Sequence, residues 1–413
     1  MSGAPEAGFG DGPPHGPLAG LHVLVVPSYW PSPESPTAGI FFVSYVRAFA
    51  AAGAQVGVVY ADLIEPHYLL RRPVLPVVPQ LKEEVLDGVP VVRVRGLHTS
   101  LRRPHRRTLR FAAWLRRGYA RYVERHGRPD LIQAHCAVPA GWPAVVLGSA
   151  PVLITEHTGP FSLALATPAM ERLTREALAA ARAIVAVSPN LRQQMLEAGI
   201  GRPIEVIPNP VAAEFAYAPP PEVRRAPAGR PLYQAIFIGR MVREKGVHEL
   251  IEAAHRLAAE GEVDLHWHLV DQGPERAALI AGLSEASGAD GVIWHGLIPR
   301  QQVARLVRES HFLVLPSYGE NCPLSVEEAL SVGRPVVGTL GTGTAALVGP
   351  DDGILCQPRD AAGLAAAIAA LLRDYGRWDA RAIATGAQAR FAPAAVAARY
   401  APLLRSATGA PGG

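Results

Sequence analysis

The chain has 413 residues, of which 49% are hydrophobic and 18% are charged, and its formal net charge is +4 at pH 7. This length allows two domains with separate cores, and the composition excludes a disordered chain. The longest apolar run, residues 361–372, is shorter than the roughly 18 residues that a transmembrane helix needs, so no membrane-spanning segment is predicted.

The first half of the chain predicts one α/β domain. Residues 1–19 are rich in Gly, Pro and Ala and are expected to form a flexible tail. Apolar runs at 21–26 and 55–61 flank a helical pattern at 41–53, which predicts a β-α-β unit with buried parallel strands. Further strand-like and helical runs alternate after it. We therefore predict a doubly wound parallel sheet in a Rossmann-like domain over residues 20–215.

The second half predicts another domain of the same class. A Pro/Ala/Arg-rich stretch over residues 216–230 is typical of a linker. The alternation of strands and helices then restarts over residues 231–390, and residues 391–413 predict a final amphipathic helix and tail. Two such domains facing each other leave a cleft, and open parallel sheets bind ligands beyond the carboxyl ends of their strands. The candidate site residues are therefore those that follow the strands.

The segment FIGRMVREKGV contains a candidate anion site. A strand-like run ends at Gly239, Arg240 and Lys245 lie in the turn, and Gly246 opens a predicted helix. Two cations beside the free amides of a helix start favour a bound anion. The segment is neither a Walker P-loop nor a G-x-G-x-x-G fingerprint. On these residues alone, a solvated Arg and Lys in a surface turn explain the pattern equally well.

A second candidate anion site lies at the start of the helix predicted within residues 316–337. Pro323 is placed as its first residue, where a missing N–H costs nothing. The N–H groups of Leu324 and Ser325 are then free to donate to a phosphate.

Three glutamates accompany that helix start. Glu320 precedes the helix and Glu328 lies in its second turn, with seven residues between them. Glu327 lies about 100° around the helix from Glu328, so the two carboxylates do not share a target. Glu327 is predicted to be a solvated spectator.

Together, these motifs carry a resemblance to a known family. FIGRMVREKGV, the E-x7-E pattern from Glu320 to Glu328, EALSVGRPVV and VIPNPV resemble the retaining, nucleotide-sugar-dependent glycosyltransferases of family four. The resemblance runs from about Leu21 to the C-terminal helix. It implies the GT-B fold, in which two Rossmann-like domains face a central cleft, and transfer of a sugar from a nucleotide-diphosphate sugar to a hydroxyl acceptor. A glycan, a lipid-linked sugar or a small metabolite is the expected acceptor.

The resemblance also implies roles for residues in the second half. Arg240 and Lys245 would hold the donor diphosphate and stabilise the leaving group. Glu320 would contact the donor sugar, and Glu328 would bond the ribose hydroxyls. No cofactor and no metal are expected, because the chain has no D-x-D motif and the cations and helix-start amides supply positive charge instead.

The resemblance further implies donor contacts around the rest of the cleft. Gly39, in a loop after the first strand, would approach the diphosphate closely because it lacks a Cβ. His157 would point at the sugar and the β-phosphate from across the cleft, and Asn209 is expected to be structural. Backbone groups of Leu297 and Ile298 would read the base. The expected catalytic residues are His157, Glu320, Arg240 and Lys245.

Several positions depart from the family pattern. The usual Phe-Gly after the first glutamate is Cys322-Pro323, which removes a backbone N–H from the phosphate site. A glycine-rich turn is replaced by residues 271–274, DQGP, and a common glutamate by Ala345 or Ala346. The donor sugar, its base and the acceptor therefore stay open.

Arginines are concentrated in the first half. Between residues 93 and 128 there are twelve arginines and one acid, Glu124. Helical spacing places Phe111, Leu115, Tyr119 and Tyr122 on one side of a predicted helix, and Arg106, Arg110, Arg117 and Arg121 on the other. This basic side is either a solvated face or a docking surface for anionic lipid. Nucleic acid is not a predicted partner, because no recognised reading motif accompanies the arginines.

Other functions remain as alternatives. A GT-B-fold epimerase or phosphorylase and a catalytically silent nucleotide-sugar-binding protein fit the same motifs. Hydrolysis by paired carboxylates is disfavoured, because the glutamates lie beside a phosphate-type site. No Lys or Arg precedes Arg47 to begin a signal peptide, and three scattered cysteines suggest a reducing compartment, so a cytoplasmic location, free or peripheral at the inner membrane face, is expected.

Overall fold

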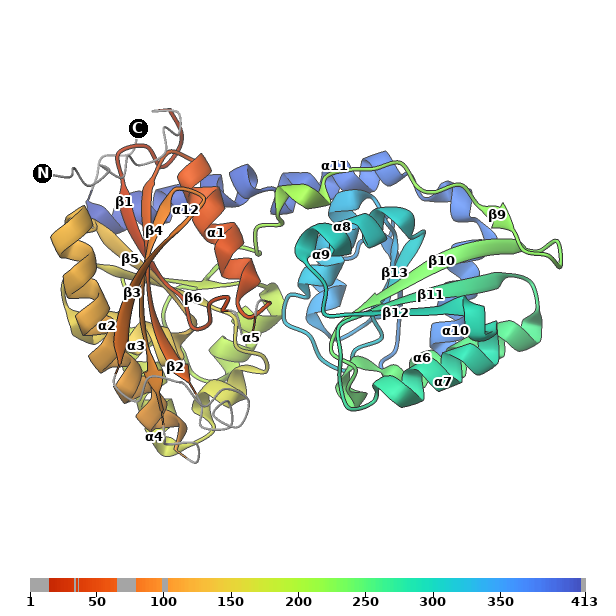
Figure 1. Cartoon of the computed structure of the whole chain (residues 1–413), viewed down its shortest axis with the longest axis horizontal. Helices are drawn as coiled ribbons and strands as arrows, with labels where there is room; N and C mark the ends of the chain where they lie inside the picture. The colour runs from red at the N-terminus through yellow and green to blue at the C-terminus, as the bar shows by residue number, and fades with distance from the viewer. Residues whose placement is uncertain (1–14, 33–34, 36, 65–78, 99–102, 410–413) are drawn as a thin grey trace, which may run out of the picture. The chain divides into compact units, whose positions relative to one another are not determined.

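The structure is a computed structural model that describes residues 15–32, 35, 37–64, 79–98 and 103–409. The chain forms two compact units (Figure 1). Unit 1 comprises residues 1–210 and 393–413, and unit 2 comprises residues 211–392. Each unit contains a largely parallel sheet covered by helices, which confirms the predicted pair of doubly wound α/β domains.

The sheet of unit 1 has eight strands in the order β3-β4-β2-β1-β5-β6-β7-β8. The strands are β1 (His22–Val26), β2 (Gln55–Ile64), β3 (Gln80–Leu86), β4 (Val89–Leu97), β5 (Leu131–His135), β6 (Val152–Glu156), β7 (Ala183–Ala186) and β8 (Glu205–Val206). All neighbours are parallel except β3 and β4. Every residue of β1, β5 and β6 is buried, as expected for strands covered on both faces.

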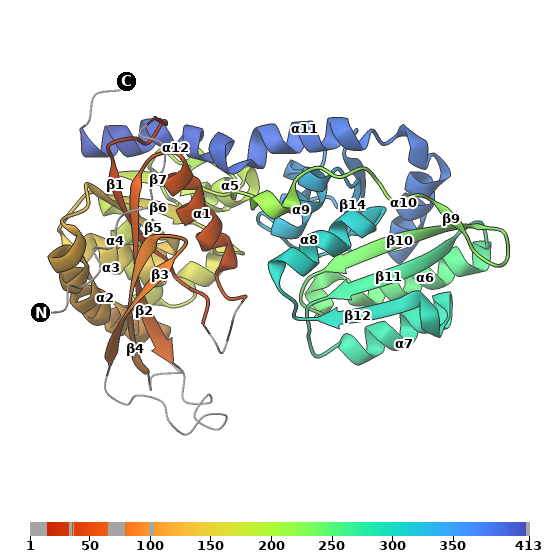
Figure 2. The same cartoon turned by 45° about the horizontal axis from the view of Figure 1, so that its top comes forward.

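Helices cover both faces of this sheet (Figure 2). They are α1 (Ile40–Ala51), α2 (Pro104–His126), α3 (Trp142–Leu147), α4 (Pro168–Ala180), α5 (Pro189–Glu197) and α12 (Pro393–Thr408). α1 packs against α12 on one face, and α2 packs against α3 on the other. The apolar residues Phe111, Leu115, Tyr119 and Tyr122 of α2 are buried, which confirms the predicted inner side of this helix.

The antiparallel β3–β4 hairpin was not predicted. Its first strand, QLKEEVL, is mostly exposed and polar, so it lacks the apolar run by which the other strands are recognised. Asp87 and Gly88 connect the two strands with φ values of 50° and 81°. Positive φ at both central residues is characteristic of a type I′ turn, for which Asp-Gly is a strong sequence signal.

The N-terminal end of unit 1 differs from expectation, whereas the predicted C-terminal helix is present as α12. Leu18 is fully buried, and its N–H donates to the carbonyl of Ala52 at 3.0 Å, so the flexible-tail prediction is wrong for residues 15–19; residues 1–14 lie outside the described part. At the other end, Tyr400 of α12 packs its ring against Tyr45 and Phe49 of α1. The final helix therefore completes the core of unit 1.

The sheet of unit 2 has the strand order β12-β11-β10-β13-β14-β15, with β9 paired to the start of β10. The strands are β9 (Arg224–Arg225), β10 (Pro231–Ile238), β11 (Asp264–Val270), β12 (Val292–Gly296), β13 (Phe312–Val314), β14 (Val336–Thr339) and β15 (Gly353–Cys356). The helices are α6 (Val247–Glu260), α7 (Arg276–Ser287), α8 (Arg300–Glu309), α9 (Leu324–Val332), α10 (Ala361–Arg373) and α11 (Ala380–Phe391).

The stretch 216–230, expected to be a linker, packs on unit 2. Arg334, fully buried, donates to the carbonyls of Ala218 at 2.9 Å and Pro219 at 2.8 Å, and β9 lies within the same stretch. The Pro-rich composition did not indicate these contacts, because the arginine that donates to the two carbonyls is distant in sequence.

No helix in the described ranges has the length and apolar character needed to cross a membrane. Cys136, Cys322 and Cys356 are all free thiols.

Candidate active site

In unit 2, the loop after β10 places the two predicted cations at the carboxyl end of the sheet. Arg240 is exposed, and Lys245 ends a short 3-10 turn, Arg243–Lys245. Gly246 begins α6 with φ 72°. A Cβ on Gly246 would lie 2.1 Å from the carbonyl oxygen of Pro316, so the positive φ and the close approach both require glycine here.

Lys245 and Glu320 form an ion pair. The Glu320 side chain is 11% exposed and that of Lys245 is 26% exposed, so the pair is only partly screened by solvent. The neighbouring N–H of Tyr318 donates to the carbonyl of Glu244 at 2.8 Å, which joins the two loops through their backbones. The structure therefore brings together two of the residues predicted to be catalytic.

The start of α9 presents backbone donors beside this pair. Pro323 is the N-cap of α9, one position before the expected place. The N–H groups of Val326 and Glu327 donate to the carbonyl of Pro323. For the N–H groups of Leu324 and Ser325, no acceptor is found in the described parts of the chain. These two donors remain available to a ligand, as predicted.

Glu328 forms a buried ion pair with Arg300. The Glu328 side chain is 1% exposed and that of Arg300 is 18% exposed. Burial raises the pKa of Glu328, while the charge and the hydrogen bond of Arg300 lower it. The guanidinium carbon of Arg300 also lies 4.6 Å from the ring centre of Phe215.

The sequence interpretation missed Arg300. A cation in the first turn of α8 is unfavourable beside the positive end of the helix dipole, and that mismatch was the available signal.

The prediction for Glu327 was wrong. Its side chain is fully buried, and the Cys322 thiol donates to its Oε1 at 3.1 Å. The helix-wheel argument assumed that one face of α9 contacts water, whereas every residue from Val326 to Val332 is buried. Cys322 thus contacts a buried carboxylate next to the turn that carries Glu320.

Two further loops complete this edge of unit 2. The N–H of Met241 donates to the carbonyl of Gln272 at 3.1 Å, and the N–H of Asp271 donates to that of Gly296 at 2.9 Å. Burial raises the pKa of Asp271, and the charges of Arg240 and Lys245 oppose that shift. Leu297 is exposed and Ile298 is half-buried, directly after Gly296. The predicted base-reading segment therefore lies on a loop joined to the cation-bearing loop.

In unit 1, Gly39 begins α1. Its φ is 67°, and a Cβ there would lie 2.5 Å from the carbonyl oxygen of Tyr29. The structure thus gives Gly39 a backbone role within its own loop, apart from any approach to a ligand.

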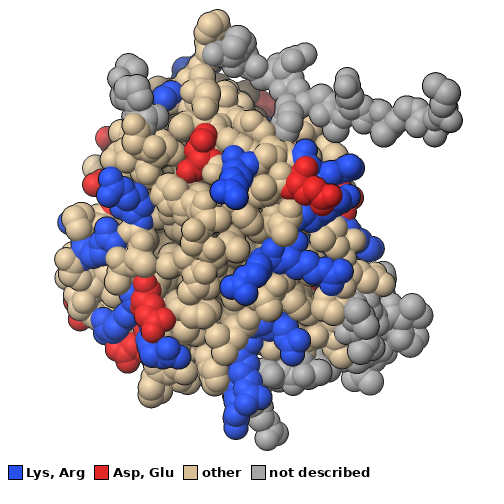
Figure 3. All heavy atoms as spheres, turned by 90° about the vertical axis from the view of Figure 1, so that its left-hand side faces the viewer, with Lys and Arg blue, Asp and Glu red and all other residues tan. Residues whose placement is uncertain are grey.

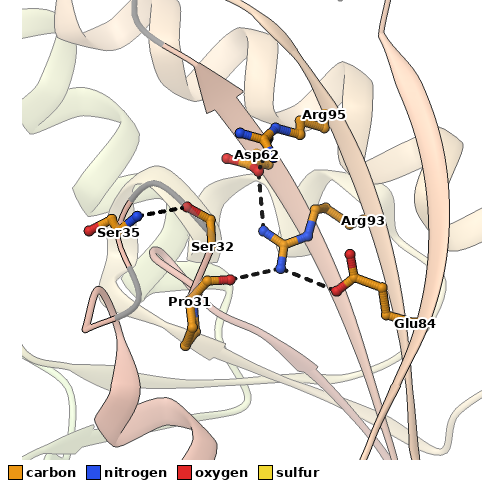
Figure 4. A network of polar contacts seen from close by, with 7 residues as sticks. All are labelled: Pro31, Ser32, Ser35, Asp62, Glu84, Arg93 and Arg95. Carbon is orange, nitrogen blue, oxygen red and sulfur yellow. Dashed lines mark hydrogen bonds and ion pairs between the residues drawn. The ribbon is translucent and has the colours of Figure 1, made fainter. Parts of the chain in front are cut away.

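A buried arginine, not foreseen from the sequence, holds the same loop (Figure 4). Arg93 of β4 donates to the carbonyl of Pro31 at 2.8 Å and to Asp62 of β2 at 3.1 Å. Its second terminal nitrogen also lies 3.4 Å from Glu84, and Arg95 lies 3.5 Å from Asp62. The network joins three strands to the loop that follows β1.

His157 lies in a cluster of aromatic and histidine rings. Its Nε2 is 2.9 Å from Nδ1 of His135, and Phe41 and Phe42 pack beside it. Burial lowers the pKa of His157 to about 3, while a hydrogen bond to Asn209 raises it. Asn209 is buried and accepts from the Tyr45 hydroxyl at 3.4 Å.

The backbone around His157 is fixed by Glu156. The buried Glu156 carboxylate accepts the N–H groups of Ala137, His157 and Thr158 at 2.8–3.0 Å. The carboxyl ends of β5 and β6 are thereby tied to each other.

The basic side of α2 is partly neutralised. Arg121 pairs with Glu83 at 2.5 Å and with Glu124 at 2.9 Å, and Arg117 donates to the carbonyl of Pro79 at 3.0 Å. Arg106 and Arg110 are exposed, and neither side chain has an acidic partner in the described ranges. On this side, Figure 3 shows some basic side chains next to acidic ones and others in a band that has no acidic neighbour in view.

No group of three or more potential metal ligands was found in the part of the chain that the structure describes. The expectation of a metal-free site stays a prediction.

Comparisons with known proteins cover most of the chain. Residues 38–215 match the family described as Glycosyltransferase Family 4, and residues 233–374 match Glycosyl transferases group 1. A Bacillus subtilis protein described as a candidate teichuronic acid biosynthesis glycosyltransferase, TuaC, is 28% identical over 361 residues, covering 84% of this chain and 88% of the relative. The 2-deoxystreptamine glucosyltransferase of Streptomyces kanamyceticus is 29% identical, covering 63% of this chain and 73% of the relative.

Solved structures share the fold. Sucrose-phosphate synthase from Thermosynechococcus elongatus superposes with a TM-score of 0.69 at 21% identity, covering 93% of this chain and 98% of that one. The lipopolysaccharide outer core galactosyltransferase WaaB superposes with a TM-score of 0.61 at 17% identity, covering 94% and 99%.

Proposed function

The chain belongs to glycosyltransferase family 4 and has the GT-B fold, and from this premise we propose that it transfers a sugar, with retention, from a nucleotide-diphosphate sugar to a hydroxyl acceptor. The observation that carries the proposal is the pairing of Lys245 with Glu320 beside the unpaired N–H groups of Leu324 and Ser325. A cation, two amides and a carboxylate there can receive a phosphate and a sugar hydroxyl together.

The cations stabilise the leaving group. Transfer breaks the bond between the sugar C1 and the diphosphate oxygen, so negative charge grows on the diphosphate. Arg240, Lys245 and the amides at the start of α9 are placed to meet that charge in unit 2. When the diphosphate binds, the Lys245 ammonium group contacts the phosphate, and the Glu320 carboxylate accepts a hydrogen bond from a sugar hydroxyl.

The bond to the acceptor forms on the face from which the diphosphate departs. The acceptor oxygen bonds to C1, and its proton passes to a phosphate oxygen of the leaving diphosphate. In this proposal the ring of His157 orients the sugar, and Gly39 approaches the diphosphate, as the family resemblance implies. None of these steps requires a metal ion or an organic cofactor.

Glu328 binds the ribose hydroxyls. Arg300 opposes the effect of burial on its pKa, which favours the charged carboxylate that accepts two hydroxyl donors best. Backbone groups of Leu297 and Ile298 contact the base. Their loop is hydrogen-bonded at Gly296 to Asp271, and the charge of Arg240 acts on Asp271.

Relatives support a hydroxyl acceptor of the sugar or aminocyclitol kind. The description of one relative names teichuronic acid biosynthesis, and another relative is a 2-deoxystreptamine glucosyltransferase. The scattered positions of the three cysteines in the sequence suit a reducing compartment, so a cytoplasmic location is part of the proposal.

A second proposal concerns the membrane surface. Arg106 and Arg110 of α2 are exposed and have no acidic partner among the residues that the structure describes, so they are the residues of the predicted surface that anionic lipid would contact. Arg117 and Arg121 already have partners and contribute less. Co-sedimentation with anionic and neutral vesicles tests this: binding should require anionic lipid and fall in the Arg106→Gln/Arg110→Gln variant, but not in Arg172→Gln. Equal binding to both vesicles, or none, contradicts it.

Donor binding is tested by thermal shift with UDP-, GDP- and ADP-sugars. One nucleotide should raise Tm, because a ligand at 100 times its Kd stabilises the folded state by about 2.7 kcal/mol. The chain has two lysines, so Lys245→Met has a matched control in Lys82→Met on exposed β3. The shift should vanish in the first variant and persist in the second. A shift that survives Lys245→Met contradicts the assignment.

The alternatives predict different products. An epimerase converts the nucleotide sugar without an organic hydroxyl acceptor. A phosphorylase consumes inorganic phosphate and forms a sugar 1-phosphate from a glycan, and a silent binding protein shows the thermal shift without turnover.

A further inference from the structure

The carboxyl ends of β5 and β6 bring His135 and His157 into direct contact in unit 1. His135 is the last residue of β5, and His157 follows the last residue of β6. Nδ1 of His135 lies 2.9 Å from Nε2 of His157. A hydrogen bond at this distance needs one proton between the two nitrogens, so the tautomer of one ring determines that of the other.

His135 has no contact with solvent. Its side chain is fully buried against the rings of Phe42 and Tyr45, with centroid distances of 4.6 and 4.8 Å. Burial, and secondarily the neighbouring His157, lower the pKa of His135 well below its ordinary value, so the ring is neutral. Among the described residues, Nε2 of His135 has no hydrogen-bond partner.

Two arrangements of the shared proton are available. If His135 carries its proton on Nε2, a buried N–H has no acceptor. If it carries the proton on Nδ1, that N–H donates to His157 and only a lone pair is left unsatisfied on Nε2. Orphaned buried N–H groups are rarer in proteins than under-satisfied acceptors, so the second arrangement is favoured.

The surroundings of His157 agree with this choice. When Nε2 accepts from His135, the proton of the neutral His157 ring lies on Nδ1. A hydrogen bond to Asn209 raises the pKa of His157, and an amide oxygen is able to accept the N–H of Nδ1.

We propose that His135 is a positioning residue that fixes the Nδ1–H tautomer of His157. A ligand oxygen that accepts a hydrogen bond from this ring must then do so at Nδ1, in competition with the amide oxygen of Asn209, because Nε2 is occupied as an acceptor. The tautomer itself does not depend on the proposed function, whereas its effect on sugar transfer does.

Nitrogen NMR of the full chain labelled with 15N-histidine tests the tautomer. Proton–nitrogen couplings distinguish Nδ1–H from Nε2–H, and His157→Asn identifies the signals. We expect the Nδ1–H form in the wild type, its loss in His135→Phe and its retention in His135→Asn, whose amide N–H replaces that of Nδ1. An Nε2–H form in the wild type, or an unchanged tautomer in His135→Phe, overturns the proposal. If His135→Phe does not fold, the wild-type spectrum still decides.

Kinetics provide the second readout. If the chain transfers sugar as proposed, kcat/KM should fall about 10–100-fold in His135→Phe, by analogy with the loss of a group that orients a metal-binding histidine, and recover in His135→Asn. The matched control is His268→Phe, which breaks the other histidine pair, His268 and His295 at 3.0 Å in unit 2, and should leave kcat/KM unchanged. Absence of turnover in the wild type contradicts the proposed function and leaves the spectroscopic result standing; a kinetic loss that His135→Asn does not restore contradicts the positioning role.

Discussion

The substitution Arg300→Met isolates the buried ion pair that supports Glu328. Methionine keeps much of the apolar stem that packs near Phe215, but it removes the guanidinium that faces the carboxylate. Since Glu328 is 1% exposed, water cannot replace the lost partner. The folded variant must therefore bury an uncompensated charge or bind a proton.

The magnitude follows from this burial. Removing one partner of a buried ion pair costs about 3–5 kcal/mol, and the lower end applies because Arg300 is 18% exposed. For a unit of this size, a loss of about 3 kcal/mol lowers Tm by about 6–12 °C. Glu328→Gln in the Arg300→Met background should recover most of that loss, because the amide carries no charge.

The pH dependence has a defined sign. Burial already raises the pKa of Glu328, and the loss of Arg300 removes the groups that lower it. The folded variant then binds a proton that the unfolded chain releases above about pH 4.5, so its deficit relative to the wild type shrinks as pH falls from 7 towards about 5.

Scanning calorimetry of the wild type, both single variants and the double variant at several pH values measures these effects. A Tm of Arg300→Met within about 1 °C of the wild type, or a double variant no more stable than Arg300→Met, would refute the reasoning.

Three other predictions concern the loops and the histidine pair. Gly343→Ala places a Cβ 1.8 Å from the carbonyl oxygen of Asn321, so it should displace the turn that carries Glu320 and cost at least about 1–3 kcal/mol; unchanged Tm and donor affinity would contradict this. Arg93→Met leaves Arg95 as the arginine that faces Asp62 and removes the donor to the carbonyl of Pro31, so calorimetry should show a loss of about 1–3 kcal/mol; a Tm equal to that of the wild type speaks against the network. Because the pKa of His157 is lowered from 6.5 to about 3, the unfolded chain binds a proton that the folded chain excludes between these values, and stability should fall as pH drops below 6.5. His157→Asn should reduce that slope in urea unfolding, and an identical slope would show that the residue is not buried neutral.

The fold was predictable where the sequence carries local signals. Strands β1, β5 and β6 contain short apolar runs, and α1, α6 and α12 show helical spacing, so the doubly wound architecture of both units followed. The edge strand β3 was missed because its exposed side chains are polar, and the Asp87-Gly88 turn was the overlooked signal. Packing of α12 on α1 joins residues far apart in sequence, and no local pattern specifies such a contact.

Only part of the candidate site was predictable from local sequence signals. Lys245 and the helix start at Pro323 were identified from residue type and spacing, and Glu320 from the family resemblance; the structure pairs Lys245 with Glu320. The partners of Glu328 and His157 were not identified from the sequence, because Arg300 and His135 lie on other elements of the fold. Glu327 was misjudged because helix geometry alone does not show that α9 is enclosed on all sides.

Acceptor-dependent release of nucleoside diphosphate tests the central claim most directly. With the nucleotide sugar that raises Tm, the wild type and Lys82→Met should release nucleoside diphosphate only when a hydroxyl acceptor is supplied, with one glycosylated product formed for each diphosphate. Lys245→Met should lose both the release and the product. Turnover of the nucleotide sugar that is independent of any acceptor, or full activity in Lys245→Met, would contradict the account.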